Sequence, residues 1–466
     1  MERMTGSDAF LWHWEWPGNP AHTLKIVIVD PAALGRPLAV ADLCAALEPR
    51  LGLAPRLTQR VQAAQWFPGR PFWINDPDFD IGAHFDEMTL PAPGTRAQLD
   101  EVFTRLATTP LALNRPLWSA TLVHGLENGQ QAIAVRLHHA IADGQGALNL
   151  MIALTSDAPS GLVDQAAAAP GERVTERQLR WAIARGALRM PLELAQLTTH
   201  GIGSTVRAFR FRRKHGDVPA PIGLHQNFIT RYAGTRRVCV SHDLDFAKVR
   251  AVSKAADVTI NGVYHSLIAA AFRDEALARG DSTKRPLAAT FGIGAADPQA
   301  DLRVSGNFVS PTNVRLFTNL ADPVERLLKT SASCRHGVEL KKDVGLKLAG
   351  RWTDFTCRLG PFFVRHAGTK TPLMVSHAIT ANVPGPPMVR YAGPVEVLRW
   401  ISIVFATKPN NINITAYSYN GVMSVGLQTS PDIFPEPRRI LDRMASELDE
   451  LHRLLIDTPA LRNASA

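Results

Sequence analysis

Two adjacent histidines and an aspartate stand close together in the segment RLHHAIADGQG, residues 136–146. Successive side chains of a strand point to opposite faces, so we expect His138 and His139 on different faces of the strand predicted at 131–139. His139 shares its face with apolar residues, and burial keeps such an imidazole neutral because it disfavours the charged form. A neutral imidazole can accept a proton from a hydroxyl or thiol, so the pattern favours His139 as a general base.

Asp143 follows this strand, beside Gly144 and Gly146, which permit a tight turn. There it could orient a histidine or brace the loop through an arginine. The pattern alone is also compatible with a core histidine followed by an ordinary Asp-Gly turn, and with a zinc site. Adjacent histidines on a strand diverge and make poor joint ligands, so no metal site is predicted.

The elements that must position these residues alternate between strands and helices in the N-terminal part of the chain. Strands are predicted at 24–29, 118–124 and 131–139, and helices at 40–51 and 96–107. The second helix has the clearest pattern, with apolar residues at helical spacing: Leu99, Val102, Phe103 and Leu106.

The C-terminal part shows the same alternation. A strand is predicted at 238–244 and helices at 261–278 and 437–456. Asn420 and Gly421 lie between two strand-like runs, which predicts a hairpin with a type I′ turn. These patterns indicate an α/β fold of two halves, with an N-terminal subdomain at 1–165, a connector at 166–235 and a C-terminal subdomain at 236–460.

The connector is strongly basic and predicts one or two helices with a cationic face. Its densest cluster comprises Arg207, Arg210, Arg212, Arg213 and Lys214, with Phe209 and Phe211 between them. A solvated helix face is the simplest interpretation of this cluster. Alternatively, the cluster binds an anionic lipid surface, where the two phenylalanines could insert, or it holds the phosphates of an acyl donor.

Composition narrows the classes of function. The 466 residues include 51 Lys and Arg against 42 Asp and Glu, a net charge of +9 that suggests an anionic partner. Aromatic residues are few and no nucleic-acid-binding motif stands out, so no nucleic acid is expected. Four scattered cysteines fit a reducing compartment. With neither a signal peptide nor a spanning run, we expect a cytoplasmic protein that lies on a membrane or lipid body rather than across the membrane.

The segment HHAIADG matches the HHxxxDG signature of CoA-dependent acyltransferases with the chloramphenicol-acetyltransferase-like fold, which peptide-synthetase condensation domains share. The flanking sequence is similar to the bacterial wax ester synthase/acyl-CoA:diacylglycerol acyltransferase family. The matching blocks occur in the family's order over nearly the whole chain: SDAFLW, PRLTQRV, WINDPDFDIGAHF, PLALNRPLW, SGNFVS, ADPVERL, ANVPGPP and NITAYSYNG.

This resemblance implies a role for each matching position. His139, the second histidine, would be the proton acceptor that activates the acceptor hydroxyl for attack on the acyl-CoA thioester. Asp143 and Gly144 would hold the loop, and His138 would support it. Pro116, Leu117 and Trp118 resemble a packing block beside the site. The resemblance implies a fold of two acyltransferase subdomains, and no cofactor is expected because acyl-CoA is a substrate.

One position departs from the family, whose members usually carry an Asn-Asp pair at the start of a helix. Asn261 and Gly262 stand at the matching positions. Asn261 could support the site, and it also fits an ordinary helix N-cap with the apolar Ile260 before it. The missing aspartate suggests that the acyl transfer activity is low.

The favoured function is therefore transfer of a long-chain acyl group from acyl-CoA to diacylglycerol, which forms triacylglycerol. A wax ester synthase that uses a long-chain fatty alcohol would employ the same base. A weakly active or non-catalytic lipid-binding paralogue is the third hypothesis, from a different class of function.

Overall fold

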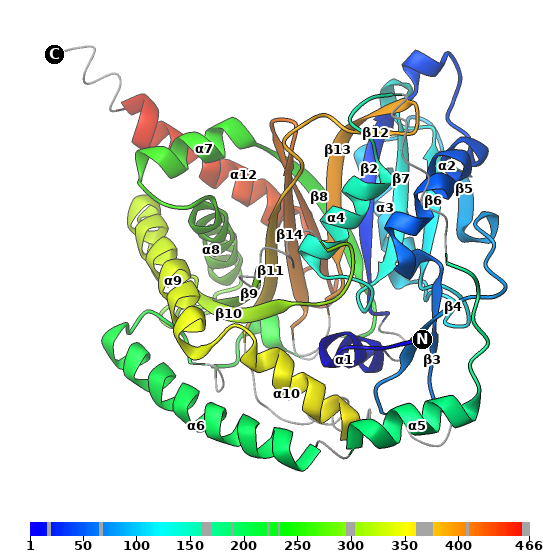
Figure 1. Cartoon of the computed structure of the whole chain (residues 1–466). Coiled ribbons are helices and arrows are strands. Elements are labelled where there is room, and N and C mark those ends of the chain that lie inside the picture. Colours follow the sequence, from blue (N-terminus) through cyan, green and yellow to red (C-terminus); the bar gives the residue numbers. More distant parts are fainter. Residues whose placement is uncertain are drawn as a thin grey trace.

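The computed structural model describes residues 1–15, 20–64, 69–159, 169–187, 190–220, 224–231, 234–294, 303–359, 376–406 and 410–458. Two six-stranded sheets stand side by side, with helices around them and between them (Figure 1). The predicted α/β class is confirmed.

The first sheet contains the strand that leads to the two histidines. Its order is β12-β13-β2-β7-β6-β5, with β5 parallel to β6 and the other pairs antiparallel. Its strands are β2 (His22–Asp30), β5 (Phe85–Thr89), β6 (Trp118–His124), β7 (Gln131–His138), β12 (Tyr391–Ala392) and β13 (Val395–Val404). The helices of this part are α1 (Gly6–Trp14), α2 (Val40–Leu47), α3 (Arg96–Thr108) and α4 (Gly144–Leu154). A small sheet of order β1-β4-β3 lies beside them, formed by Glu2–Arg3, Phe72–Asn75 and Gln59–Gln62.

The second sheet has the order β10-β9-β11-β14-β15-β8. Its strands are β8 (Val238–Asp245), β9 (Ala288–Gly294), β10 (Val309–Arg315), β11 (Ala378–Pro384), β14 (Ile412–Tyr419) and β15 (Val422–Thr429). Its helices are α7 (Phe246–Ala255), α8 (Ile260–Ala278), α9 (Pro323–Val344), α10 (Leu348–Thr356) and α12 (Arg438–His452). The predicted hairpin is confirmed, since Asn420 and Gly421 have φ of 47° and 77° between β14 and β15.

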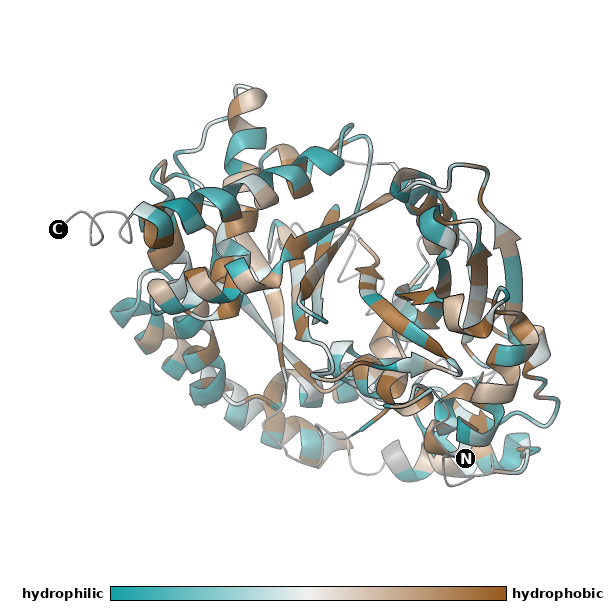
Figure 2. Ribbon diagram, turned by 90° about the horizontal axis from the view of Figure 1, so that it is seen from above, coloured by the Kyte–Doolittle hydropathy of each residue, from teal (hydrophilic) through white to brown (hydrophobic). Residues whose placement is uncertain are grey.

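The last α-helix of the second half buries one apolar face and exposes the other. Seen from above, the helix nearest the C-terminus carries hydrophilic and hydrophobic bands along its length (Figure 2). This is α12, whose buried residues recur at helical spacing and include Ile440, Met444, Leu448 and Leu451.

The sheets do not follow the expected boundaries at 165 and 235. Strands β12 and β13 come from the C-terminal half of the chain, yet β13 pairs with β2 along eight positions, from Glu396 opposite Asp30 to Val404 opposite Thr23. The first sheet is therefore completed by residues more than 350 positions away, and the two halves are interlocked.

The described part of the connector contains two α-helices, α5 (Glu176–Ala187) and α6 (Met190–Lys214), and a short 3-10 helix at Phe228–Thr230. The two α-helices run along the lower edge of the molecule in Figure 1, where α6 packs against α9 and α10. Among the described residues, no helix is both long and apolar enough to cross a membrane.

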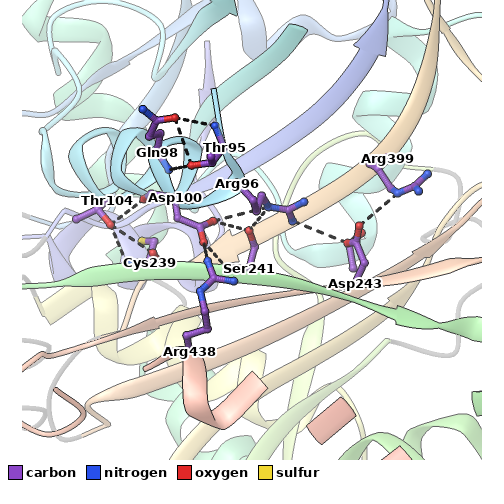
Figure 3. Close-up of polar contacts among 11 residues, drawn as sticks. Thr95, Arg96, Gln98, Asp100, Thr104, Cys239, Ser241, Asp243, Arg399 and Arg438 are labelled. Carbon is purple, nitrogen blue, oxygen red and sulfur yellow. Dashed lines mark hydrogen bonds and ion pairs between the residues drawn. The ribbon is translucent and has the colours of Figure 1, made fainter. Parts of the chain in front are cut away.

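A polar network joins the first sheet's α3 to β8 of the second (Figure 3). Asp100 on α3 is 4% exposed and accepts hydrogen bonds from Ser241 Oγ at 2.5 Å and from Arg438 at 2.6 Å. Arg96 donates to Ser241 Oγ at 2.8 Å. Charged hydrogen bonds of this kind fix the two halves relative to each other, because a slip would leave a buried carboxylate without donors.

Candidate active site

A cavity of about 580 Å³ lies between the two sheets and is lined by residues from both. The first half contributes residues of β2, the end of β7 and the start of α4, and the second contributes β9, β11, β14 and the loop before β10. The lining residues include Thr23, Lys25, His139, Asp143, Gly144, Arg303, Asn307, Thr380 and Tyr417.

His139 follows the last residue of β7 and lines this cavity. Its backbone N–H donates to Ala21 O at 2.9 Å, and its ring meets the edge of Phe405 at a centroid distance of 5.7 Å. Burial lowers the pKa of His139 to about 4, and the charge of Lys25 acts in the same direction. The imidazole is therefore neutral near pH 7 and able to accept a proton.

Asn307 determines which nitrogen of His139 carries the proton. The Asn307 Nδ2 donates to Asp8 Oδ1 and to His139 O, both at 2.8 Å, so its Oδ1 must be the acceptor toward the ring. That oxygen lies 3.1 Å from His139 Nδ1, which is consequently the protonated nitrogen. Nε2 is left with a free lone pair, as a general base requires.

Asp8 on α1 completes this chain of contacts. Its carboxylate is 2% exposed and also accepts the backbone N–H of Asn307 at 3.0 Å. Burial raises the pKa of Asp8 to about 6, against the opposing hydrogen bonds from Asn307 and Thr5. The sequence patterns single out neither Asp8 nor Asn307. The only signal is their place in the SDAFLW and SGNFVS blocks.

His138 lies in different surroundings and does not line the cavity. Its Nδ1 accepts the backbone N–H of Ala140 at 3.0 Å, so the proton is on Nε2, 3.1 Å from Glu15 Oε2. Glu15 also accepts the N–H of Ala21, the residue that holds His139 through its carbonyl. His138 thus supports the backbone around His139.

Asp143 is the N-cap of α4, with Oδ1 accepting the N–H of Gly146 at 2.9 Å. Its Oδ2 accepts from Arg303 at 2.5 Å and from the N–H of Phe308 at 2.9 Å. The sequence allowed two roles for Asp143, to orient a histidine or to brace the loop through an arginine. The structure shows the second of these roles. The brace also connects the histidine loop to the segment that carries Asn307.

Gly144 and the Pro116–Trp118 block pack around the same loop. A Cβ on Gly144 would lie 3.2 Å from Val383, and its carbonyl accepts the hydroxyl of Tyr417 at 3.1 Å. Pro116 is buried, and Leu117 O accepts the N–H of His138 at 3.0 Å. Trp118 donates to Leu57 O at 2.8 Å and lines a narrow apolar pocket of about 80 Å³.

Asn261 is not the N-cap that the sequence suggested. Thr259 caps α8, and its side chain accepts the N–H of Gly262 at 3.0 Å. Asn261 lies in the first turn, where its carbonyl accepts from His265, and it does not line the cavity that holds His139. A Cβ on Gly262 would lie 2.4 Å from Ser331 Oγ of α9, so close helix packing explains the glycine at this position.

Within the described residues, one group brings three metal-ligand side chains together: His215, Asp217 and His336, whose ligand atoms lie within 4.8 Å of one another. His336 already pairs with Asp217 at 2.9 Å. The group joins the end of α6 to α9 and lies outside the cavity.

Two family descriptions match the chain. The "wax ester synthase/diacylglycerol acyltransferase catalytic domain" matches residues 4–264, and the "WS/DGAT C-terminal domain" matches residues 305–452. The chain belongs to this acyltransferase family. The family resemblance inferred from the sequence is thereby confirmed.

Relatives of this acyltransferase occur in Mycobacterium tuberculosis (strain ATCC 25618 / H37Rv). One named "Putative diacyglycerol O-acyltransferase" is 31% identical over 436 residues, covering 90% of each chain. A second of the same name is 26% identical over 466 residues, covering 98% of this chain and 92% of its own.

Two solved structures share the fold. The wax ester synthase/diacylglycerol acyltransferase from Marinobacter aquaeolei VT8 superposes with a TM-score of 0.69 at 20% identity, covering 97% of this acyltransferase and 99% of its own chain. The first condensation domain of the calcium-dependent antibiotic synthetase has a TM-score of 0.61 at 17% identity, covering 96% and 97%.

Replacing the two histidines should have unequal effects. His139→Ala removes the only one of the pair that lines the cavity, so kcat should fall on the order of 10²–10⁴-fold. His138→Ala should cost less, because it acts through the backbone. Steady-state acyl transfer, with melting temperatures to compare folding, measures both. Losses in the reverse order would contradict the assignment.

The acidic limb of the pH–rate profile should report His139. With a pKa of about 4 the base itself stays neutral well below the usual histidine range, so once the titration of Asp8 is removed, kcat/KM should fall only as the pH approaches 4. In the wild-type enzyme Asp8, with a pKa of about 6, is protonated before His139 as the pH falls, so it adds an inflection of its own. The variant Asp8→Asn cannot titrate at that position and is the control. If Asp8→Asn still lost activity with a pKa near 6.5, His139 would not have the lowered pKa.

Proposed function

We propose that this acyltransferase moves a long-chain acyl group from acyl-CoA to the hydroxyl of diacylglycerol and forms triacylglycerol. The proposal rests on the state and position of His139. Its imidazole is neutral, its Nδ1 contacts Asn307, and its Nε2 is free in a cavity that residues of both halves line. The names of the mycobacterial relatives favour diacylglycerol as the acceptor.

The proposed reaction needs one base and one leaving group. His139 Nε2 takes the proton of the acceptor hydroxyl while the oxygen attacks the thioester carbonyl. The tetrahedral intermediate then collapses, the C–S bond breaks, and the CoA thiolate takes the proton back from the imidazolium. The products are an ester and CoA, and His139 is neutral again.

A narrow apolar pocket of about 80 Å³ lies next to the cavity and has room for only the end of a hydrocarbon chain. Its lining is almost entirely apolar and includes Val27, Leu150 and Met151. Lys25 lines both spaces, so they adjoin. Burial of apolar surface in such a pocket stabilises a bound hydrocarbon chain by roughly 25 cal/mol per Å².

Two other functions use the same features. A long-chain fatty alcohol also presents one hydroxyl on an apolar chain, and wax ester synthesis would need no further group. A non-catalytic lipid-binding role was suggested by the glycine at 262. That glycine contacts Ser331 of α9 and does not line the cavity, which weakens the argument for lost activity.

An acceptor panel tests the proposal. Purified protein with labelled palmitoyl-CoA should release CoA and form labelled triacylglycerol with diacylglycerol, faster than wax ester with hexadecanol. His139→Ala is the matched control. Preferential wax ester formation would establish the fatty-alcohol alternative, and absence of CoA release with every acceptor would establish the binding-only alternative.

We further propose that one face of α6 rests on an anionic lipid surface. Ile202, Val206 and Phe209 follow one another at i, i+4 and i+7 and are 64%, 45% and 66% exposed. Arg210, Arg213 and Lys214 are exposed at the end of the helix. Apolar side chains flanked by cations are typical of helices that lie in a membrane interface.

Part of the predicted basic cluster faces the protein instead. Arg207 donates to Asp343 O at 3.0 Å, and Arg212 is partly buried, which lowers its pKa. Phe211 stacks on His215 at a centroid distance of 4.5 Å, so the expectation that it inserts beside Phe209 is wrong. Alternate residues of a helix lie on different faces, which is why only Phe209 points outward.

Vesicle flotation should show binding to anionic vesicles that weakens as salt rises. Neutralising Arg210, Arg213 and Lys214 should lower binding roughly a hundredfold at low salt, at about 1 kcal/mol for each cation. Ile202→Ser with Phe209→Ser should also weaken it, whereas Leu277→Ser, exposed on α8, is the control. Unchanged flotation together with a raised KM for acyl-CoA would instead assign the cations to the CoA phosphates.

A further inference from the structure

A buried lysine, Lys25, lies in the centre of the first sheet. Lys25 stands on β2 between Val135 of β7 and Ser402 of β13, and it is 2% exposed. Alternation along β2 puts it on the face that also carries Thr23 and Val27. Thr23 lines the catalytic cavity and Val27 the apolar pocket, so Lys25 lies at the junction of the two spaces.

The contacts of the ammonium group leave its charge without a direct counter-ion. Nζ donates to Ser402 Oγ at 2.7 Å and to Tyr417 OH at 3.3 Å, two neutral oxygens. Within the described part of the chain no carboxylate forms an ion pair with it. Asp143 lies near enough to act on its charge, but that carboxylate is already paired with Arg303.

A buried ammonium in this state is costly. Removing the charge from water costs several kcal/mol, and two neutral acceptors offset only part of that cost. Burial accordingly lowers the pKa of Lys25 to about 7, with Asp143 opposing the shift. An ammonium has three N–H donors, and the two described acceptors use two of them. An anion that entered the cavity would supply both the missing charge and a third acceptor.

We propose that Lys25 is the anion-binding group of an acceptor subsite, so that this enzyme also acylates hydroxy lipids that carry a carboxylate or phosphate. The inference rests on the proposed acyl transfer by His139 and extends it to a second class of acceptor. The position of Lys25 inside the cavity, next to the apolar pocket, distinguishes this subsite from the exposed cations of α6.

The chemistry at the hydroxyl is the same as for a neutral acceptor. The hydroxyl oxygen forms the new ester bond, the thioester C–S bond breaks, and the proton passes through His139 to the CoA thiolate. The carboxylate or phosphate is not consumed. It pairs with Lys25 while the hydroxyl of the same molecule lies at His139.

Two matched pairs of acceptors test the subsite with palmitoyl-CoA as the donor. The phosphate pair is a monoacylglycerol phosphate and the monoacylglycerol with the same chain. The carboxylate pair is 3-hydroxyhexadecanoate and its methyl ester, because Lys25 and His139 line the same cavity and the anion and the hydroxyl must therefore lie close together in the acceptor. The measured quantity is the ratio of kcat/KM for the anionic and the neutral member of each pair. This ratio is internal to one preparation, so partial unfolding of a variant does not change it.

Lys25→Met should lower the ratio roughly ten- to a hundredfold for at least one pair, the loss expected for a hydrogen bond between charged groups. Lys25→Arg keeps the charge and should retain more of the ratio. Lys329→Met, an exposed lysine on α9, is the control and should leave the ratio unchanged. The pair that responds identifies carboxylate or phosphate as the bound group.

Three outcomes would overturn the inference: an unchanged ratio in Lys25→Met, an equal loss for both members of each pair, or wild-type enzyme that acylates only the neutral acceptors. In the last case the proposed acyl transfer would still stand. If wild-type enzyme released no CoA with any acceptor, the proposed function itself would fail.

Discussion

The side-chain amide of Asn307 is the contact on which the orientation of the base depends. It donates to Asp8 from α1 and to the carbonyl of His139, and its oxygen meets the imidazole. Because the amide has one donor end and one acceptor end, the buried carboxylate of Asp8 decides which end faces the ring. The tautomer of His139 therefore follows from a charge that is separated from the imidazole ring by two hydrogen bonds.

The contact between Asn307 and His139 requires the two halves of the molecule to keep a fixed relative position. Asp143 bonds to Arg303 and Phe308, so the segment that carries Asn307 is tied to the loop after His139. Strand β13 is a second connection between the halves, because it belongs to the C-terminal half of the chain but pairs with β2. That crossing brings Ser402 to Lys25 and leads directly to Phe405, which meets the ring of His139.

Several charges around the cavity are buried, and each has different partners. Asp143 is neutralised by Arg303, whereas Asp8 receives hydrogen bonds from Asn307 and has a pKa raised to about 6. Lys25 has only neutral acceptors, and its pKa is lowered to about 7. Folding alone does not favour an ammonium in such a place, because desolvation opposes its charge. A buried lysine with a lowered pKa at the edge of a catalytic cavity is typical of a functional site.

The sequence by itself determined the local features. The period of apolar residues predicted α3 and α12, Asn420-Gly421 predicted the hairpin, and strand alternation separated His138 from His139, because these patterns depend on neighbours along the chain. The contacts of His139 with Asn307, of Asp143 with Arg303 and of Lys25 with Ser402 span 168, 160 and 377 positions. Only the tertiary structure could decide them, since residues so distant meet through sheet order and the crossing of β13, for which no local pattern carries a signal. The same holds for Gly262 and Phe211, whose surroundings depend on which helix packs against them.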